Sequence, residues 1–173
     1  VQHGRPAHLL MIGGQVGSSD PSNERYLAHV REQIGALGLS DRVHWTGFVP
    51  PTAVSAHFLA ADLCVLPYQD GAGRSRGSLM AALAHGRPIV TTRPQRPLPG
   101  FADGENMLWT PLADPQAVAA AVVRVMTEPL LRQRLAAGAQ ALSQQFTWTA
   151  IAAQYLALFG QWQGRAHPGR ASS

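Results

Sequence analysis

Short apolar runs alternate with amphipathic segments along this chain. Glycine or proline closes each run within a few residues, which is typical of short buried strands. The first run is continuously apolar from Leu9 to Ile12 and ends at Gly13, the pattern of a strand buried on both faces. The runs predict five strands, at residues 8–12, 43–46, 63–66, 88–91 and 107–110.

The segments between and after these runs carry apolar residues three or four positions apart, the period of an amphipathic helix. Thr52 is the expected N-cap of one helix, and Asp114 followed by Pro115 is a cap with a first-turn proline. The pattern predicts helices at residues 23–37, 52–61, 77–84, 115–128, 130–144 and 149–159.

Alternating strands and helices predict an α/β fold, a doubly wound, Rossmann-like parallel sheet of about five strands with flanking helices. Such sheets bind ligands at the carboxyl ends of their strands, where loops lead into helix N-termini. One domain is expected over residues 1–160. The Gly-, Pro-, Arg- and Ser-containing segment 161–173 is expected to be a flexible tail.

Composition narrows the class of protein. The chain has 173 residues, of which 46% are hydrophobic and 14% charged, so it can bury a core and is not intrinsically disordered. No apolar run is long enough to span a bilayer. The single cysteine, Cys64, excludes a disulfide framework and a cysteine-rich metal site and fits a reducing compartment, so a cytoplasmic location is expected.

The basic residues point to an anionic partner. The formal net charge is +4, and every basic residue is arginine, which binds phosphate or carboxylate bidentately. Five of them fall in one stretch without Asp or Glu: Arg74, Arg76, Arg87, Arg93 and Arg96. This stretch favours a phosphate site over the alternative of scattered surface arginines.

The loop at residues 68–78 is the main candidate site, because it leads from the third strand into a helix. Peptide N–H groups at Gly77, Ser78 and Leu79 would face the crevice, and a helix N-terminus carries about half a positive charge. Arg74 and Arg76 lie beside it in the sequence. The alternative is an ordinary strand-to-helix loop.

Other chemistry has less support. Gly13 and Gly14 lack dinucleotide-binding spacing, and the seven histidines include no pair at metal-ligand spacing with a carboxylate. No nucleophile-elbow motif is present, and His85 is expected to be structural. The Arg-rich stretch has too few aromatic residues to bind single-stranded nucleic acid.

The segment 46–49 lies at the carboxyl end of the second strand. Its backbone groups there can hydrogen-bond the edge of a planar base.

Several segments together resemble the family 4 glycosyltransferases of the GT-B fold. The similarity runs from about His8 to Phe159. The segments fall in the family's order: 9–14, 41–49, 61–67, 81–92, 103–106, 111–115 and 146–148.

This resemblance implies the carboxyl-terminal, donor-binding half of a two-lobed enzyme. Such enzymes move a sugar from a nucleotide-diphosphate sugar to an acceptor held by the amino-terminal lobe, without a metal or cofactor and with a retaining outcome. It implies that Phe48 and Val49 flank the base. The residues it places on the diphosphate are Arg74, Arg76, Gly77, Ser78 and Leu79. The resemblance also implies that the family's donor lobe has one more strand and helix before this chain begins, so the chain is expected to be inactive alone.

Two family glutamates are replaced here, by Gly73 and Ala81. In the family they contact the donor sugar and the ribose. A branch of the family carries Asp-Gly and Arg-Gly-Ser motifs, as this chain does at 70–71 and 76–78. The resemblance to that branch suggests that Asp70, Gly73 and Ser75 lie at the donor sugar and ribose.

Two alternatives remain open. A nucleotide-sugar epimerase of the same fold would need acid/base carboxylates, for which this chain offers Asp70 and Asp103. A degenerate, non-catalytic partner-binding domain is favoured by Gly73 and Ala81. The basic surface also allows peripheral contact with anionic lipid.

Overall fold

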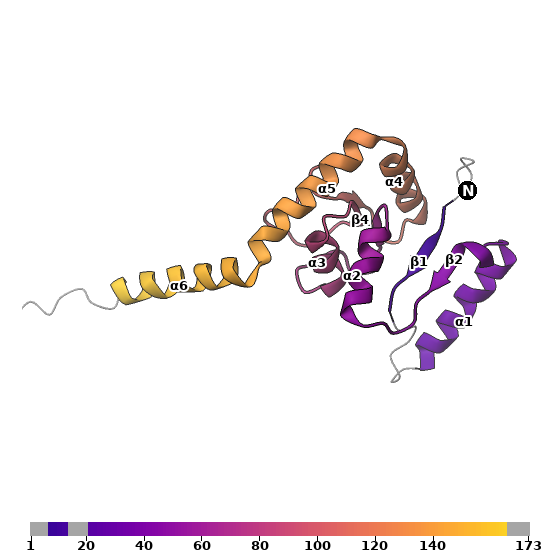
Figure 1. The fold of residues 1–173 in the computed structure, drawn as a ribbon, viewed down its shortest axis with the longest axis horizontal. Coiled ribbons are helices and arrows are strands. Elements are labelled where there is room, and N and C mark those ends of the chain that lie inside the picture. Colours follow the sequence, from indigo (N-terminus) through magenta and orange to yellow (C-terminus); the bar gives the residue numbers. More distant parts are fainter. Residues whose placement is uncertain (1–6, 14–20, 166–173) are drawn as a thin grey trace, which may run out of the picture. The chain divides into compact units, whose positions relative to one another are not determined.

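The computed structural model describes residues 7–13 and 21–165, which form an α/β protein with parallel sheets and flanking helices, as predicted (Figure 1). The chain divides into two compact units, residues 1–61 and 62–173. All five predicted strands are present. Their hydrogen-bonded ladders form one sheet of two strands and another of three.

The first unit contains the two-stranded sheet. Strand β1 (Leu9–Met11) pairs in parallel with β2 (Val43–Trp45), and helix α1 (Pro21–Ala36) and the short helix η1 (Ser40–Arg42) join them. The expected burial of the first strand on both faces is wrong, since Leu9 and Met11 are exposed. Side chains alternate along a strand, so these two share the face that is open to water.

Helix α2 (Pro51–Ala60) follows β2 and ends the first unit. The expected cap at Thr52 is wrong: the N-cap is Pro50, and Thr52 lies inside the helix. The fixed φ of proline suits the first helical position, so Pro51 starts the helix one residue earlier.

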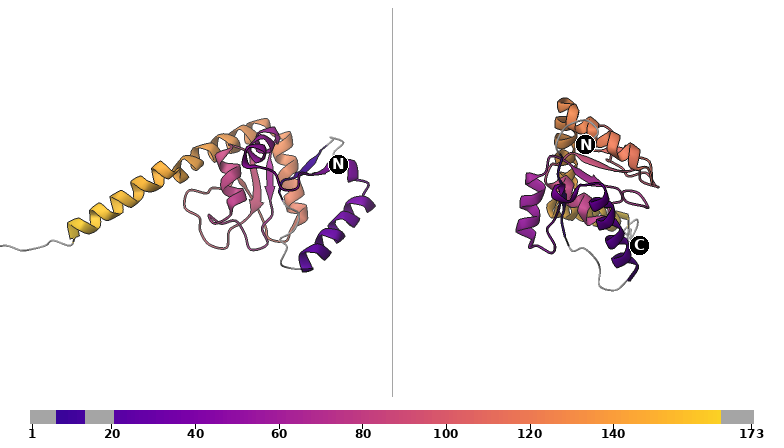
Figure 2. Two further views of the ribbon diagram at one scale, coloured as in Figure 1. Left: turned by 60° about the horizontal axis from the view of Figure 1, so that its bottom comes forward. Right: turned by 90° about the vertical axis from the view of Figure 1, so that its right-hand side faces the viewer.

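The second unit contains a parallel sheet in the order β3 (Cys64–Leu66), β4 (Ile89–Thr92), β5 (Leu108–Thr110). Helix α3 (Gly77–Ala84) connects β3 to β4, and a loop connects β4 to β5. Helices α4 (Pro115–Thr127) and α5 (Pro129–Ser143) follow and pack on the sheet (Figure 2). All four residues of β4, the central strand, are buried.

The core of this unit lies between the sheet and its helices. Asp114 caps α4 as predicted, because its Oδ1 accepts a hydrogen bond from the Ala117 N–H at 2.8 Å. Leu79 and Leu83 of α3 are fully buried. One cluster joins β4, β5, α4 and α5: Val90, Leu108, Ala121, Val125, Leu131 and Leu135.

A last helix extends from the second unit. The short helix η2 (Gln144–Phe146) leads into α6 (Trp148–Arg165), which projects away from the three-stranded sheet (Figures 1 and 2). The helix continues past its predicted end at Phe159. The rest of the predicted tail, 166–173, lies outside the described residues. No helix in the described part of the chain is long and apolar enough to span a membrane.

Candidate functional site

Two loops meet at the carboxyl edge of the three-stranded sheet. Because β3 and β4 are parallel, the loops that follow them emerge on the same side. The Ala72 N–H donates to the Thr92 carbonyl at 3.1 Å, and the Thr92 hydroxyl donates to the Tyr68 carbonyl at 2.7 Å. These bonds anchor the candidate loop to the end of the central strand.

Gly71 allows the candidate loop to approach the backbone at the end of β4 closely. Its φ is +84°, and a Cβ built on it would lie 2.5 Å from the Arg93 carbonyl oxygen. Only glycine adopts this positive φ without strain and has no Cβ atom to clash with the carbonyl oxygen. Gly71 and Ala72 are buried, so the loop turns against the sheet and presents the following residues outward.

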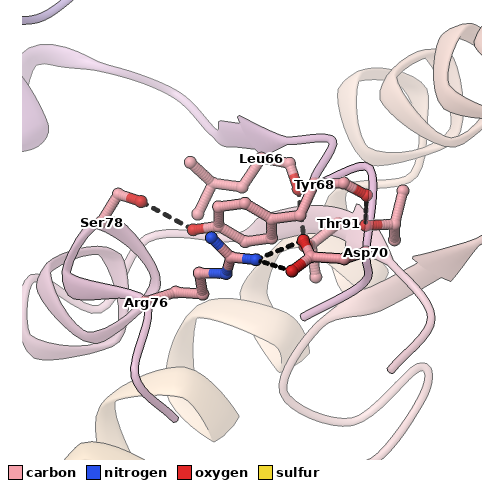
Figure 3. Close-up of polar contacts among 7 residues, drawn as sticks. Leu66, Tyr68, Asp70, Arg76, Ser78 and Thr91 are labelled. Carbon is pink, nitrogen blue, oxygen red and sulfur yellow. Dashed lines mark hydrogen bonds and ion pairs between the residues drawn. The ribbon is translucent and has the colours of Figure 1, made fainter. Parts of the chain in front are cut away.

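Four side chains form a connected group, the Arg76 network, made of Tyr68, Asp70, Arg76 and Ser78 (Figure 3). The Arg76 guanidinium carbon lies 5.0 Å from the centroid of the Tyr68 ring. Its Nη2 donates to both carboxylate oxygens of Asp70. The Tyr68 and Ser78 hydroxyl oxygens are 2.6 Å apart and hydrogen-bonded. The network joins the loop to the first turn of α3.

The first turn of α3 is open to solvent. Its N-cap residue, Arg76, offers no side-chain cap, and the Met80 N–H is the first to bond back, to the Arg76 carbonyl at 3.1 Å. Among the described residues, no acceptor pairs with the peptide N–H groups of Gly77, Ser78 and Leu79. Gly77 and Ser78 are exposed, whereas the Leu79 side chain is fully buried. Three donors thus converge where the helix dipole is positive.

The five arginines of the sequence stretch do not form one group. Arg76 pairs with Asp70, and Arg93 lies 3.9 Å from Asp103, so carboxylates from outside the stretch accompany two of them. Neither pairing follows from the absence of Asp and Glu within residues 74–96, because Asp70 and Asp103 both lie outside that stretch.

Arg87 lies at the opposite edge of the sheet. It lies two residues before the start of β4, and its Nε donates to the His85 carbonyl at 3.1 Å. Burial raises the pKa of the nearby Cys64 thiol to about 11, against a smaller opposing effect of the Arg87 charge. A buried thiol with this pKa is a poor nucleophile. His85 has the expected structural contact, since its Nδ1 is 2.7 Å from the Ala81 carbonyl oxygen.

Arg74 and Arg96 differ in their surroundings. Arg74 donates to the Pro99 carbonyl at 2.8 Å, and its guanidinium carbon lies 5.6 Å from the Phe146 ring centroid. It thereby ties the candidate loop to the loop after β4 and to η2. Arg96 is exposed on the loop after β4.

The other predicted contact residues divide between the two units. Ser75 is exposed and Gly73 is half-buried, both in the loop before α3. Phe48 and Val49 belong to the first unit, after β2, where Phe48 is 90% exposed. The role of Phe48 and Val49 at a nucleobase stays a prediction.

The carboxylates considered for acid/base chemistry already have partners. Asp70 accepts from Arg76, and the Asp103 Oδ1 accepts from the Trp109 N–H at 2.9 Å. Within residues 7–13 and 21–165, no group of three or more His, Cys, Asp or Glu side chains is arranged to hold a metal ion.

The sequence of this chain matches a known family of enzymes. Residues 1–128 match the model of the family described as "Glycosyl transferases group 1". The chain therefore belongs to that glycosyltransferase family.

Curated relatives fit this assignment. The chain is 29% identical over 151 residues to mannosylfructose-phosphate synthase of Agrobacterium fabrum, covering 86% of this chain and 32% of that protein. It is 34% identical over 125 residues to the lipopolysaccharide core biosynthesis glycosyltransferase LpsE of Rhizobium meliloti, covering 70% of this chain and 35% of that protein. The chain spans about a third of the length of these relatives.

Solved structures show the same GT-B fold. Sucrose-phosphate synthase from Thermosynechococcus elongatus superposes with a TM-score of 0.72 at 25% identity, over 91% of this chain and 39% of that one. HepE from Anabaena, solved in complex with UDP, gives a TM-score of 0.75 at 22% identity, over 90% of this chain and 41% of that one.

Proposed function

We propose that this chain forms the donor-binding part of a glycosyltransferase that uses a nucleotide-diphosphate sugar. The observation that carries the proposal is the exposed first turn of α3, where the N–H groups of Gly77, Ser78 and Leu79 lack partners among the described residues, with Arg76 beside them. Such a turn suits a phosphate group. HepE, which shares the fold, was solved with UDP and with UDP-glucose, which supports a diphosphate ligand.

The proposed chemistry is electrostatic. When the bond between the sugar and the diphosphate breaks, negative charge builds up on the leaving phosphate. Fixed N–H donors and a guanidinium group stabilise this charge more in the transition state than in the bound substrate, which lowers the barrier. Because these donors supply positive charge directly, the proposed reaction is metal-independent, and the family resemblance implies retention at the anomeric carbon.

The remaining contacts complete the proposed donor site. Arg74 is assigned to the diphosphate, and Asp70, Gly73 and Ser75 are assigned to the donor sugar and ribose. The acceptor is assigned to an amino-terminal lobe. This chain alone is expected to bind donor without transferring sugar.

A calorimetric titration of the protein with UDP, GDP and ADP tests the proposal. One of these should bind, and Arg76→Ala should weaken its binding about tenfold or more, as expected for a lost charge-assisted hydrogen bond. Arg124→Ala is the matched control, because Arg124 lies on the last turn of α4 and pairs with Glu128 at 3.1 Å. Absence of binding by all three nucleotides, or equal binding by wild type and Arg76→Ala, would favour a non-catalytic partner-binding domain.

A further inference from the structure

The Asp70 carboxylate occupies one particular nitrogen of Arg76. Both carboxylate oxygens accept from Nη2. The Asp70 side chain is 67% exposed and the Arg76 side chain 36% exposed. Figure 3 shows the carboxylate at the end of the guanidinium group, while the guanidinium lies across the Tyr68 ring.

That nitrogen decides how Arg76 can bind an anion. A guanidinium group has two edges with paired, parallel N–H donors, Nε with Nη2 and Nη1 with Nη2, and Nη2 belongs to both. Bidentate binding of a phosphate uses one of these edges. With both Asp70 oxygens on Nη2, neither edge is free. A phosphate can then reach Arg76 only through single hydrogen bonds, unless Asp70 moves away.

Asp70 is free to move. Its side chain is largely exposed, and within the described part of the chain Arg76 is its only hydrogen-bonding or ion-pair partner. Arg76 is more fixed, since its guanidinium stacks on Tyr68 and its peptide N–H donates to the Gly73 carbonyl at 3.0 Å. The Tyr68 hydroxyl is in turn bonded to Ser78. Release of the carboxylate would therefore leave the guanidinium in place beside the first turn of α3.

We infer that Asp70 is a built-in competitor for Arg76, which lowers the affinity of the site for a diphosphate group and is displaced when that group binds. The inference rests on the proposed function. Asp70 also places a negative charge beside the phosphate site, so its neutralisation removes a repulsion as well as a competitor. An exposed ion pair is weak, so removing it should strengthen diphosphate binding by about two- to fivefold.

The test is a titration with UDP and with inorganic pyrophosphate, neither of which carries a donor sugar. Contacts of Asp70 with a donor sugar therefore do not enter either measurement, and pyrophosphate also excludes contacts with the ribose. Asp70→Asn keeps the side-chain shape and should bind both probes more tightly than wild type. Asp70→Ala should change affinity in the same direction. Thermal unfolding of each variant checks that the fold is retained.

Two controls separate competition from a general charge effect. Asp103→Asn removes a carboxylate that pairs with Arg93 in the loop after β4, and the Asn Oδ1 can still accept from Trp109. It should leave affinity nearly unchanged. In an Arg76→Ala background, Asp70→Asn should no longer change the affinity, because the guanidinium for which Asp70 competes is absent. The double-mutant cycle measures this coupling.

The outcomes separate the two proposals. If Arg76→Ala weakens UDP binding while Asp70→Asn weakens it too or leaves it unchanged, the site is right and the competitor is wrong, since Asp70 then positions Arg76 or is inert. If Asp103→Asn matches Asp70→Asn, a general charge effect replaces competition. If neither wild type nor Asp70→Asn binds either probe, both proposals fall.

Discussion

Gly138 lies where α5 passes directly over the loop that joins β4 to β5. A Cβ built on Gly138 would lie 2.2 Å from the Glu105 carbonyl oxygen and 3.0 Å from the Asn106 Cα. Both neighbours are backbone atoms, so no side chain can rotate away. Gly138→Ala therefore forces α5 and this loop apart.

The size of the effect follows from how firmly the loop is held. Asn106 is buried, accepts from the Ala102 N–H at 3.0 Å and donates to the Gly100 carbonyl at 2.9 Å. The new methyl group must retreat by roughly 1 Å to reach ordinary contact. Overpacking costs about 1–3 kcal/mol, and a clash with backbone atoms falls in the upper part of this range, at about 2–3 kcal/mol. Alanine regains about 1 kcal/mol of helix propensity, so a net loss of about 1–2 kcal/mol is expected.

Urea unfolding followed by circular dichroism measures this loss. Gly160→Ala in α6 is the matched control, because a Cβ there meets nothing within 4 Å and the change should be neutral or stabilising. If Gly138→Ala were as stable as wild type, the close approach of α5 to the loop would be wrong.

Three further predictions concern single residues. The buried Cys64 thiol has a pKa of about 11 against 9.0 for the unfolded chain. Between these pH values the unfolded chain loses its proton first, so the free energy of unfolding should fall by about 2–3 kcal/mol as pH rises. Urea unfolding at a series of pH values should show no such decrease in the free energy of unfolding for Cys64→Ala. The same dependence of this free energy on pH in both proteins would contradict the prediction. Asp114→Ala should lower the free energy of unfolding by about 1 kcal/mol through loss of the α4 cap, whereas an unchanged urea midpoint would argue against the cap. Gly71→Ala should weaken UDP binding by displacing the loop, and unchanged calorimetric affinity would refute that role.

The periodicity of the sequence predicts most of the fold, because the apolar residues whose spacing defines a strand or helix are also the residues that pack in the core. Helix α3 begins at Gly77 and α4 is capped by Asp114, as local sequence chemistry requires. The side chain of Thr52 suits an N-cap, but Thr52 lies inside α2. The preceding Pro51 is the stronger local signal.

The candidate site was only partly predictable. The three N–H groups at the start of α3 follow from a loop that leads into a helix. The position of Arg87 also follows from topology, because α3 carries the chain back to the amino ends of the strands before β4 begins. The pairing of Asp70 with Arg76 depends on the turn at Gly71 and on side-chain rotamers, which spacing alone does not determine.

The proposed function depends on the binding of a diphosphate at the first turn of α3. Titration of ¹⁵N-labelled protein with UDP, followed by amide resonances in NMR spectra, tests it most directly. The amide resonances of Gly77, Ser78 and Leu79 should shift progressively and saturate with UDP, whereas uridine without phosphate should leave them unchanged. Saturable binding of UDP that leaves these three amides unmoved would contradict it.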